Sequence, residues 1–381
     1  MLHCLLAVLQ TSVGGSPPPQ EVVLAQRDLA FTSPPLELTY ASALVDPALN
    51  VYLSDDVAPA LYLLKPGGDT VRTLMRRGRG PGEVSQIRAS GWRGDTLWVL
   101  DGALQRITLL PAGRRAVVTW RYQEKCRTLN AWALLRDGRC LMGQAPGPGR
   151  KDGDPMVVEV GAGAGGGTDT ILTLSTTNAY SRFRWNDGQA NLPQPFGDNP
   201  LLAIARTSDF VVVAFRTVAT SPSEASFGLR VWSMRSGWGP ARSYNYRPRP
   251  LSKQSRDSAV TALLSSVTRY SPASPVTADS IRRKLFTPRF LPPLTMAFVG
   301  RDSLIWLGMR ERETGQTHHG YREYRVYDLT GALVRTVGLP SNARPLDAYG
   351  PFVWCLVLDS DEVPTIVRFR IGNLTSATTP R

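Results

Sequence analysis

Short apolar runs alternate with polar turns along the whole chain, and one combination of the two recurs. A turn with Asp, Asn or Gly leads into an apolar–aromatic–apolar triplet, as in RGDTLWVLD (93–101) and GRDSLIWLG (300–308). Four further segments repeat this pattern: DPALNVYLSDD (46–56), LRDGRCLMG (135–143), TSDFVVVAF (207–215) and AYGPFVWCLVLD (348–359). Alternation of apolar and polar residues is typical of β-strands with one buried face. The sequence therefore contains six copies of one strand-forming unit.

Each copy is followed by a second alternating segment that ends in a turn. These segments are ALYLLKPGG (60–68), QRITLLPAG (105–113), MVVEVGAG (156–163), LRVWSMRSG (229–237), YRVYDLTG (324–331) and TIVRFRIGN (365–373). A third short strand pattern follows in most copies, for example TVRTL (70–74) and RAVVTW (115–120). Each unit thus predicts three or four short antiparallel strands joined by polar turns.

The spacing of the copies indicates the fold. Where no insertion intervenes, the copies recur at a period of about 40–50 residues, which is typical of β-propeller blades. Blades stacked around a ring bury both of their faces, whereas a β-sandwich would show no internal repeat. We expect an all-β, six-bladed β-propeller with four-stranded antiparallel blades. Trp98, Trp306 and Trp354 are expected in the core between blades.

Two segments depart from the repeat. Residues 21–25 (EVVLA) precede the first copy and are predicted to close the ring as the outer strand of blade six. Residues 246–291 contain two helical patterns, 258–267 after Asp257 and 277–286 after Thr277, between the outer strand of blade four and the inner strand of blade five. This helical insertion is expected either to lid the channel mouth or to pack on the rim.

The predicted domain organisation follows from these segments. Residues 21–373 form one propeller domain closed by the N-terminal strand, and residues 374–381 form a tail. Residues 1–20 combine a short apolar run with small residues and a Pro-rich spacer, as in a partial signal segment. This pattern predicts export to the periplasm, cell surface or extracellular space. No stretch is long and apolar enough for a transmembrane helix, and we expect a monomer.

The stretch MRRGRGPGEV (75–84) stands between the outer strand of blade one and the inner strand of blade two. Its glycines and its proline, Gly78, Gly80, Pro81 and Gly82, together with Glu83, resemble a junction element of bacterial six-bladed β-propeller proteins related in shape to NHL-repeat propellers. Many members of that group are exported and of unknown function. The sequence departs from the usual aromatic residue after the glutamate by having Val84. The resemblance implies the fold and leaves the function open.

The same stretch does not fit a phosphate-binding loop. Glu83 stands where such a loop needs Lys, and Pro81 lacks a backbone donor. A single short RG segment between strands is also unlike the longer RNA-binding RG repeats. Arg77, Arg79 and Glu83 are therefore candidate binding residues at the channel rim, where guanidinium groups can hold a carboxylate or sugar phosphate. In the alternative, Arg–Glu pairing fixes the turn.

Other chemistry finds little support in the residues present. The three histidines are His3 in the signal-like segment and the adjacent His318 and His319 in a polar loop, which is too few for a metal site by themselves. No GxSxG elbow is present, and no catalytic residue, metal ligand or cofactor is predicted. Cys126 and Cys140 can meet across neighbouring strands as a disulfide in an oxidising compartment, or remain free buried thiols.

Charge enters the argument last. The net charge is +13, but only five of the 44 basic residues are lysines and the arginines are spread along the chain, which is typical of GC-rich coding bias. We expect a non-enzymatic binding module of the cell envelope that recognises a protein, peptide or glycan at the channel face. One alternative is a lactonase- or lyase-like propeller enzyme with a channel-bound cation. The second is a basic propeller that binds RNA.

Overall fold

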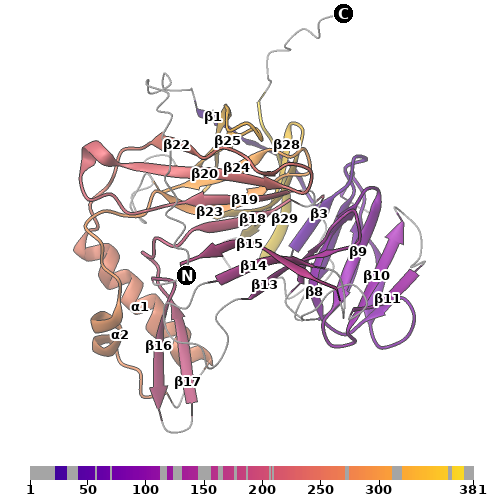
Figure 1. Ribbon diagram of the computed structural model, residues 1–381, viewed down its shortest axis with the longest axis horizontal. Helices are drawn as coiled ribbons and strands as arrows, with labels where there is room; N and C mark the ends of the chain where they lie inside the picture. Colours follow the sequence, from indigo (N-terminus) through magenta and orange to yellow (C-terminus); the bar gives the residue numbers. More distant parts are fainter. Residues whose placement is uncertain are drawn as a thin grey trace, which may run out of the picture.

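The strands form a six-bladed β-propeller of mostly four-stranded antiparallel blades, as the repeat predicted (Figure 1). The computed structural model describes residues 22–31, 42–55, 58–68, 71–111, 118–122, 131–144, 156–161, 166–175, 178–185, 188–205, 207, 210–270, 274–310, 320–358 and 363–372. All six copies of the sequence pattern supply the second strand of a blade. They include the copies at 135–143 and 207–215, which match the pattern least well.

The first three blades follow one another along the chain. Blade 1 contains β3 (Ser42–Val45), β4 (Val51–Asp55), β5 (Ala60–Leu64), β6 (Val71–Arg77) and the short β7 (Glu83–Val84). Blade 2 contains β8 (Ile87–Arg93), β9 (Thr96–Asp101), β10 (Arg106–Pro111) and β11 (Val118–Arg121). Blade 3 contains β12 (Ala131–Leu134), β13 (Cys140–Gln144), β14 (Met156–Gly161) and β15 (Thr168–Leu174).

The remaining blades include the N-terminal strands. Blade 4 contains β18 (Leu201–Ile204), β19 (Phe210–Phe215), β20 (Ser226–Ser233), β21 (Gly237–Trp238) and β22 (Arg242–Asn245), with the short 3-10 helix η3 (Pro222–Glu224) between β19 and β20. Blade 5 contains β23 (Leu294–Val299), β24 (Ile305–Met309), β25 (Tyr321–Tyr327), β26 (Leu333–Pro340) and β1 (Val22–Leu24). Blade 6 contains β27 (Ala343–Tyr349), β28 (Phe352–Leu358), β29 (Pro364–Arg370) and β2 (Gln26–Ala30).

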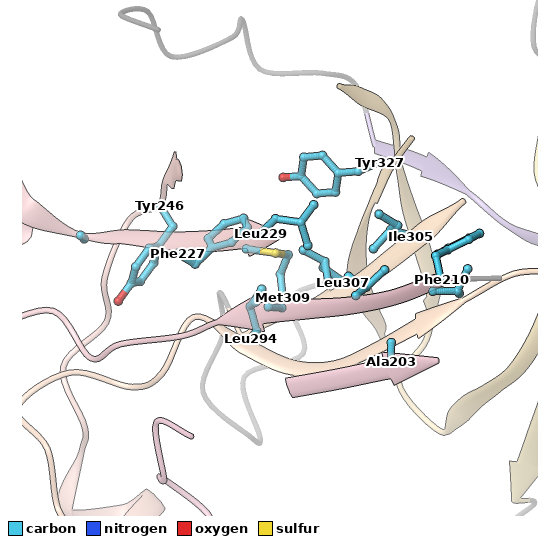
Figure 2. Packing of buried hydrophobic residues seen from close by; sticks show 14 of the residues in the cluster. Ala203, Phe210, Phe227, Leu229, Tyr246, Leu294, Ile305, Leu307, Met309 and Tyr327 are labelled. Carbon is cyan, nitrogen blue, oxygen red and sulfur yellow. The ribbon is translucent and has the colours of Figure 1, made fainter. Parts of the chain in front are cut away.

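The hydrophobic core lies between neighbouring blades. Trp306 and Trp354 are fully buried and Trp98 is 2% exposed, as predicted for the aromatic residues of the repeat. Trp306 packs in a cluster drawn from blades 5 and 6, and Trp354 in one drawn from blades 6 and 1. Between blades 4 and 5, Phe227 and Leu229 lie against Met309, as Figure 2 shows. Burial of apolar side chains between adjacent blades therefore holds the ring together.

The strand that closes the ring lies further along the N-terminal segment than the predicted residues 21–25. The outer strand of blade 6 is β2, which pairs with β29 antiparallel, and Asp28 forms an ion pair with Arg368 there. The segment predicted at 21–25 instead supplies β1, which pairs with β26 of blade 5 in parallel. The alternation of EVVLA indicated a strand correctly, but local alternation does not encode which sheet edge a strand joins. One short segment thus spans two blades.

Two insertions pack together beside blade 4, at the lower left of Figure 1. The hairpin of β16 (Tyr180–Trp185) and β17 (Gly188–Pro193) lies between blades 3 and 4, and the helices α1 (Lys253–Tyr270) and α2 (Ala278–Lys284) lie between blades 4 and 5. We call these four elements the appendage. Its own small core is formed by Phe183, Leu192, Val260, Val267 and Ile281.

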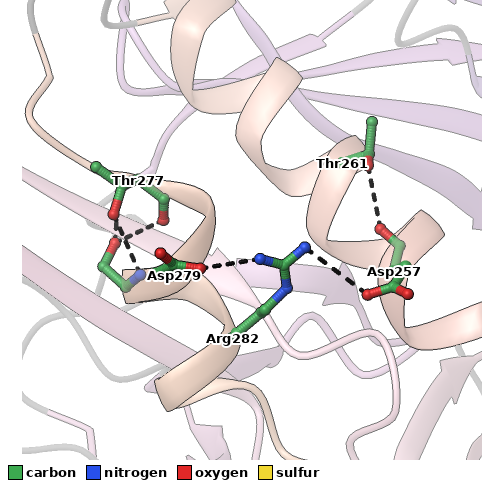
Figure 3. A network of polar contacts seen from close by, with 6 residues as sticks. Asp257, Thr261, Thr277, Asp279 and Arg282 are labelled. Carbon is green, nitrogen blue, oxygen red and sulfur yellow. Dashed lines mark hydrogen bonds and ion pairs between the residues drawn. The ribbon is translucent and has the colours of Figure 1, made fainter. Parts of the chain in front are cut away.

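The helices differ in detail from the prediction. Thr277 caps α2 in a capping box with Ser280, whereas α1 begins before Asp257, which therefore is not its cap. Arg282 instead joins the two helices, because its guanidinium lies 3.8 Å from Asp257 and 2.9 Å from Asp279 (Figure 3). Ion pairing across the helices thus orients α2 on α1.

Two further observations concern the cysteines and the helices. Cys140 is disulfide-bonded to a partner outside the described residues, while Cys355 is free and buried. The predicted pairing with Cys126 therefore stays a prediction. Within the described ranges, no helix has the length and apolar character needed to span a bilayer.

Candidate functional site

A cavity of about 250 Å³ lies between the inner strands of blades 2, 3, 4 and 5. β8, β12, β18 and β23 each contribute part of its wall, so it occupies the central channel. Its lining side chains are mostly apolar or aromatic, with Ser90 supplying the one hydroxyl group, and polar atoms form about as much of its surface as apolar atoms. The lining residues are Ser90, Gly91, Trp98, Trp132, Ala133, Leu202, Ala203, Ile204, Ala205, Ala297, Phe298 and Val299.

Glycines let two tryptophan rings lie against the strands of this wall. A Cβ at Gly91 would stand 2.8 Å from Cζ2 of Trp98, and a Cβ at Gly143 would overlap the ring of Trp132 at 1.6 Å. The indole Nε1 of Trp98 is buried and has no hydrogen-bond partner. A buried indole N–H usually has a partner, but the Nε1 atoms of Trp92, Trp306 and Trp354 share this feature, so it does not by itself mark the cavity.

The repeat pattern predicts Trp98 in the core and does not predict the cavity. Trp98 is buried between strands and also lines the cavity, so the two roles are not exclusive. The sequence did not predict Trp132 and Phe298 as site residues, because they lie on the first strands of their blades, outside the recurring triplet. The one available signal was the pairing of glycines in strands, such as Gly91 and Gly143, with tryptophans on their neighbours.

A charged group lies at the turns between first and second strands. Arg301, in the β23–β24 turn, places its guanidinium 4.6 Å from the ring centre of Trp92 in blade 2. Burial lowers the pKa of Arg301, and the carboxylates of Asp347, Asp95 and Asp46 act in the opposite direction. These residues come from the inner hairpins of blades 1, 2, 5 and 6, so Arg301 links four blades.

Two carboxylates of this group, those of Asp347 and Asp46, accept hydrogen bonds from backbone N–H groups. Asp347, which is fully buried, accepts hydrogen bonds from the backbone N–H of Val45 at 2.9 Å and of Ala348 at 2.8 Å. Asp46 accepts from the backbone and side chain of Asn50. In the part of the chain that the structure describes, no three His, Cys, Asp or Glu residues are grouped as metal ligands. His318 and His319 lie outside the described residues.

The predicted site residues Arg77, Arg79 and Glu83 lie at the junction of blades 1 and 2. Glu83 accepts hydrogen bonds from Arg76 Nε at 2.9 Å and from the backbone N–H of Gly80 at 2.8 Å. These bonds lower the pKa of Glu83, the Gly80 bond most strongly. The sequence alone did not predict Arg76 as the partner of Glu83.

The rest of this loop is fixed by its neighbours. Arg106 on β10 donates hydrogen bonds to the carbonyl oxygens of Arg79, Gly80 and Glu83. Gly82 has a φ of 74°, and a Cβ at Gly78 would stand 2.1 Å from Oε2 of Glu83. The glycines therefore allow the turn and the close approach of the carboxylate. The side chains of Arg77 and Arg79 are exposed.

The fold defines the class of protein: the chain is a six-bladed β-propeller. Solved structures similar to it include a Bacteroides fragilis protein inferred to be exported (11% identity, TM-score 0.43, 94% of this chain and 98% of that chain). A DUF4221 family member from Bacteroides vulgatus has 10% identity and a TM-score of 0.44 over 93% of this chain and 98% of that chain. Regucalcin, a calcium-binding protein of Agrobacterium tumefaciens, has 10% identity and a TM-score of 0.38 over 92% and 97%.

No protein-family model matches the sequence, and no curated protein matches it significantly. Structural likeness at such low identity carries no information on function, because one fold supports many functions. The function has to be argued from the site.

Proposed function

We propose that the protein is a non-enzymatic binding module of the cell envelope, which recognises a protein, peptide or glycan at its channel face. The observation that carries the proposal is the cavity of about 250 Å³ in the central channel, whose lining side chains are mostly apolar or aromatic. Ligand sites are typically concave and apolar with a few polar groups that set orientation. Trp132, which is partly exposed, offers a ring for stacking, and Ser90 offers one hydroxyl group.

The wall offers binding more readily than chemistry. General acid–base catalysis requires an ionisable group within reach of the substrate, and calcium requires several oxygen ligands. The residues that line the cavity include no carboxylate, histidine, lysine or arginine. The nearby Asp347 and Asp46 hold backbone N–H groups. A lactonase- or lyase-like reaction is therefore the weaker alternative.

The remaining parts of the proposal come from the sequence. The apolar, signal-like character of residues 1–20 supports export, and the scattered arginines favour a ligand other than RNA. Arg77 and Arg79 are exposed beside a loop that Glu83 and Arg106 fix in place, so we propose that they extend the binding face at the rim.

An array of immobilised peptides and oligosaccharides tests this function. We expect the wild-type protein to retain a subset of them, and Ser90→Leu to weaken that binding because the larger side chain occupies part of the cavity and removes its hydroxyl group. Ser243→Leu, an exposed substitution on β22, is the matched control and should bind normally.

The fate of the retained molecule separates the alternatives. Mass spectrometry after prolonged incubation should recover it unchanged. Conversion to a product would favour the enzyme. Retention of RNA at physiological salt, with no peptide or glycan bound, would favour the basic propeller. Either result, or equal binding by Ser90→Leu, would refute the proposal.

A further inference from the structure

Two arginines occupy equivalent positions at the ends of neighbouring blades. Arg216 directly follows β19 of blade 4, and Arg310 directly follows β24 of blade 5. In the antiparallel registers, Leu201 pairs with Ala214 and Leu294 pairs with Met309. Both arginines therefore lie at the end of the blades where the inner strands begin. The sequence shows the repetition in VVVAFR and IWLGMR.

Arg216 is anchored across the boundary between the two blades. Its Nε donates a hydrogen bond to the carbonyl of Asn199, which precedes blade 4, and its Nη1 donates to the carbonyl of Leu294 in blade 5 at 3.1 Å. Two of its donors are thus used to position the guanidinium beside the start of β23.

Arg310 is held by its backbone and not by its side chain. Its backbone N–H donates to the carbonyl of Pro293 at 2.7 Å. The preceding Met309 packs beside Leu294 in the core between blades 4 and 5 (Figure 2). The Nε of Arg310 is buried without a hydrogen-bond partner, and its guanidinium forms no ion pair with any described residue.

A third arginine lies beside Arg310 on the next strand. Gly308 pairs with Tyr324, so the same register brings Arg310 opposite Arg322 on β25. The pKa of Arg310 is lowered to about 10, first by burial and then by the positive charges of Arg216 and Arg322. Asp198 opposes the lowering of the pKa of Arg216.

An arrangement of this kind is costly unless a negative charge joins it. Arg310 is partly exposed, but its Nε is buried without a partner among the described residues, and like charges at short range add to the cost. The planar guanidinium group matches carboxylate and phosphate oxygens in a two-point geometry. Arg310 has the free donor, and Arg216 and Arg322 supply the surrounding positive charge.

We infer that Arg310, together with Arg216 and Arg322, forms a binding site for an oxyanion group, a carboxylate or a phosphate, at the end of blades 4 and 5. Arg310 donates to the anion, Arg322 adds a second cation from the adjacent strand, and Arg216 fixes the boundary between the blades. This site is separate from the aromatic cavity, and it stands or falls independently of the function proposed above.

Thermal unfolding in inorganic phosphate, with sodium chloride adjusted to constant ionic strength, tests the site. We expect phosphate to raise the unfolding midpoint of the wild-type protein saturably, because it binds the folded state. Arg310→Met should weaken phosphate binding by about tenfold or more, since it removes the charge-assisted donor. Sodium acetate in parallel shows whether a carboxylate binds in place of phosphate.

Two further variants make the test specific. Arg322→Gln should also weaken binding, and Arg283→Met, an exposed substitution on α2, should leave it unchanged. In chloride alone, Arg310→Met should unfold at the same or a higher temperature than wild type. The inference is overturned if phosphate and acetate both act like chloride, if Arg310→Met keeps the response to the anion that binds, or if that variant is destabilised in chloride alone.

Discussion

The carboxylate of Glu83 lies against Gly78 and leaves no room for a side chain there. A Cβ at this position would stand 2.1 Å from Oε2 of Glu83, so Gly78→Ala must displace that side chain. We expect a small loss in the free energy of unfolding, because the carboxylate can move but then gives up its hydrogen bond from the Gly80 N–H. Gly167→Ala, where nothing lies within 4 Å, is the control in chemical denaturation.

A double-mutant cycle identifies the cause. If the clash with Glu83 is responsible, Gly78→Ala should cost much less in the Glu83→Ala background. An equal cost in both backgrounds would place the strain in the backbone instead.

Glu83 should also make the stability depend on pH. Its pKa is lowered from the ordinary value of 4.5 by the Gly80 N–H and by Arg76. The folded state therefore binds fewer protons there than the unfolded state, and the stabilisation is present above pH 4.5 and lost as the pH falls through the lowered pKa. Glu83→Gln should be less stable than wild type at pH 7 and should converge with it in acid. A constant difference from pH 7 into acid would contradict this assignment.

Among the elements, the appendage has its own core and should unfold on its own. Ile281 is 2% exposed and packs with Phe183 and Val260 rather than with a blade. We expect Ile281→Ala to cost about 2–5 kcal/mol locally. Hydrogen exchange should then quicken in α1, α2 and β16–β17 while the blades stay protected. Faster exchange in blade 4 as well would show that the appendage and the propeller unfold together.

The elements also show what the sequence can and cannot predict. The alternating triplets predicted all six blades, because a strand with one buried face imposes that pattern. Both helices were predicted, but the start of α1 was wrong. Asp257 is a residue type typical of helix caps, but here its carboxylate pairs with Arg282. The β16–β17 hairpin went unassigned because its two strands, YSRFRW and GQANLP, lack the apolar–aromatic–apolar triplet of the repeat.

The site was less predictable than the fold for a related reason. The partner of Glu83, the aromatic wall and the arginines at blades 4 and 5 all depend on residues that are distant in sequence and meet only in the closed ring. A repeat pattern reports which face of a strand is buried and not what lies across the channel.

For the whole molecule, ring closure by the N-terminal strand is the main prediction. β2 covers the outer edge of blade 6 and β1 that of blade 5, so removal of residues 1–31 exposes two strand edges. We expect a lower unfolding midpoint and a less cooperative transition. A protein that lacks only residues 1–20 keeps both strands and should unfold like the full chain. Equal stability of the two shortened proteins would show that the ring does not need this closure.

The central claim is that the channel cavity is the ligand site, and the indole N–H of Trp98 reports on it most directly. Trp98 is among the residues that line the cavity, and its buried Nε1 has no hydrogen-bond partner among the described residues. Its 1H–15N resonance, assigned with Trp98→Phe, can be followed while a ligand selected from the array is titrated. We predict that this resonance shifts saturably with the same affinity as binding. A ligand that binds fully while the Trp98 resonance stays in place would contradict the account.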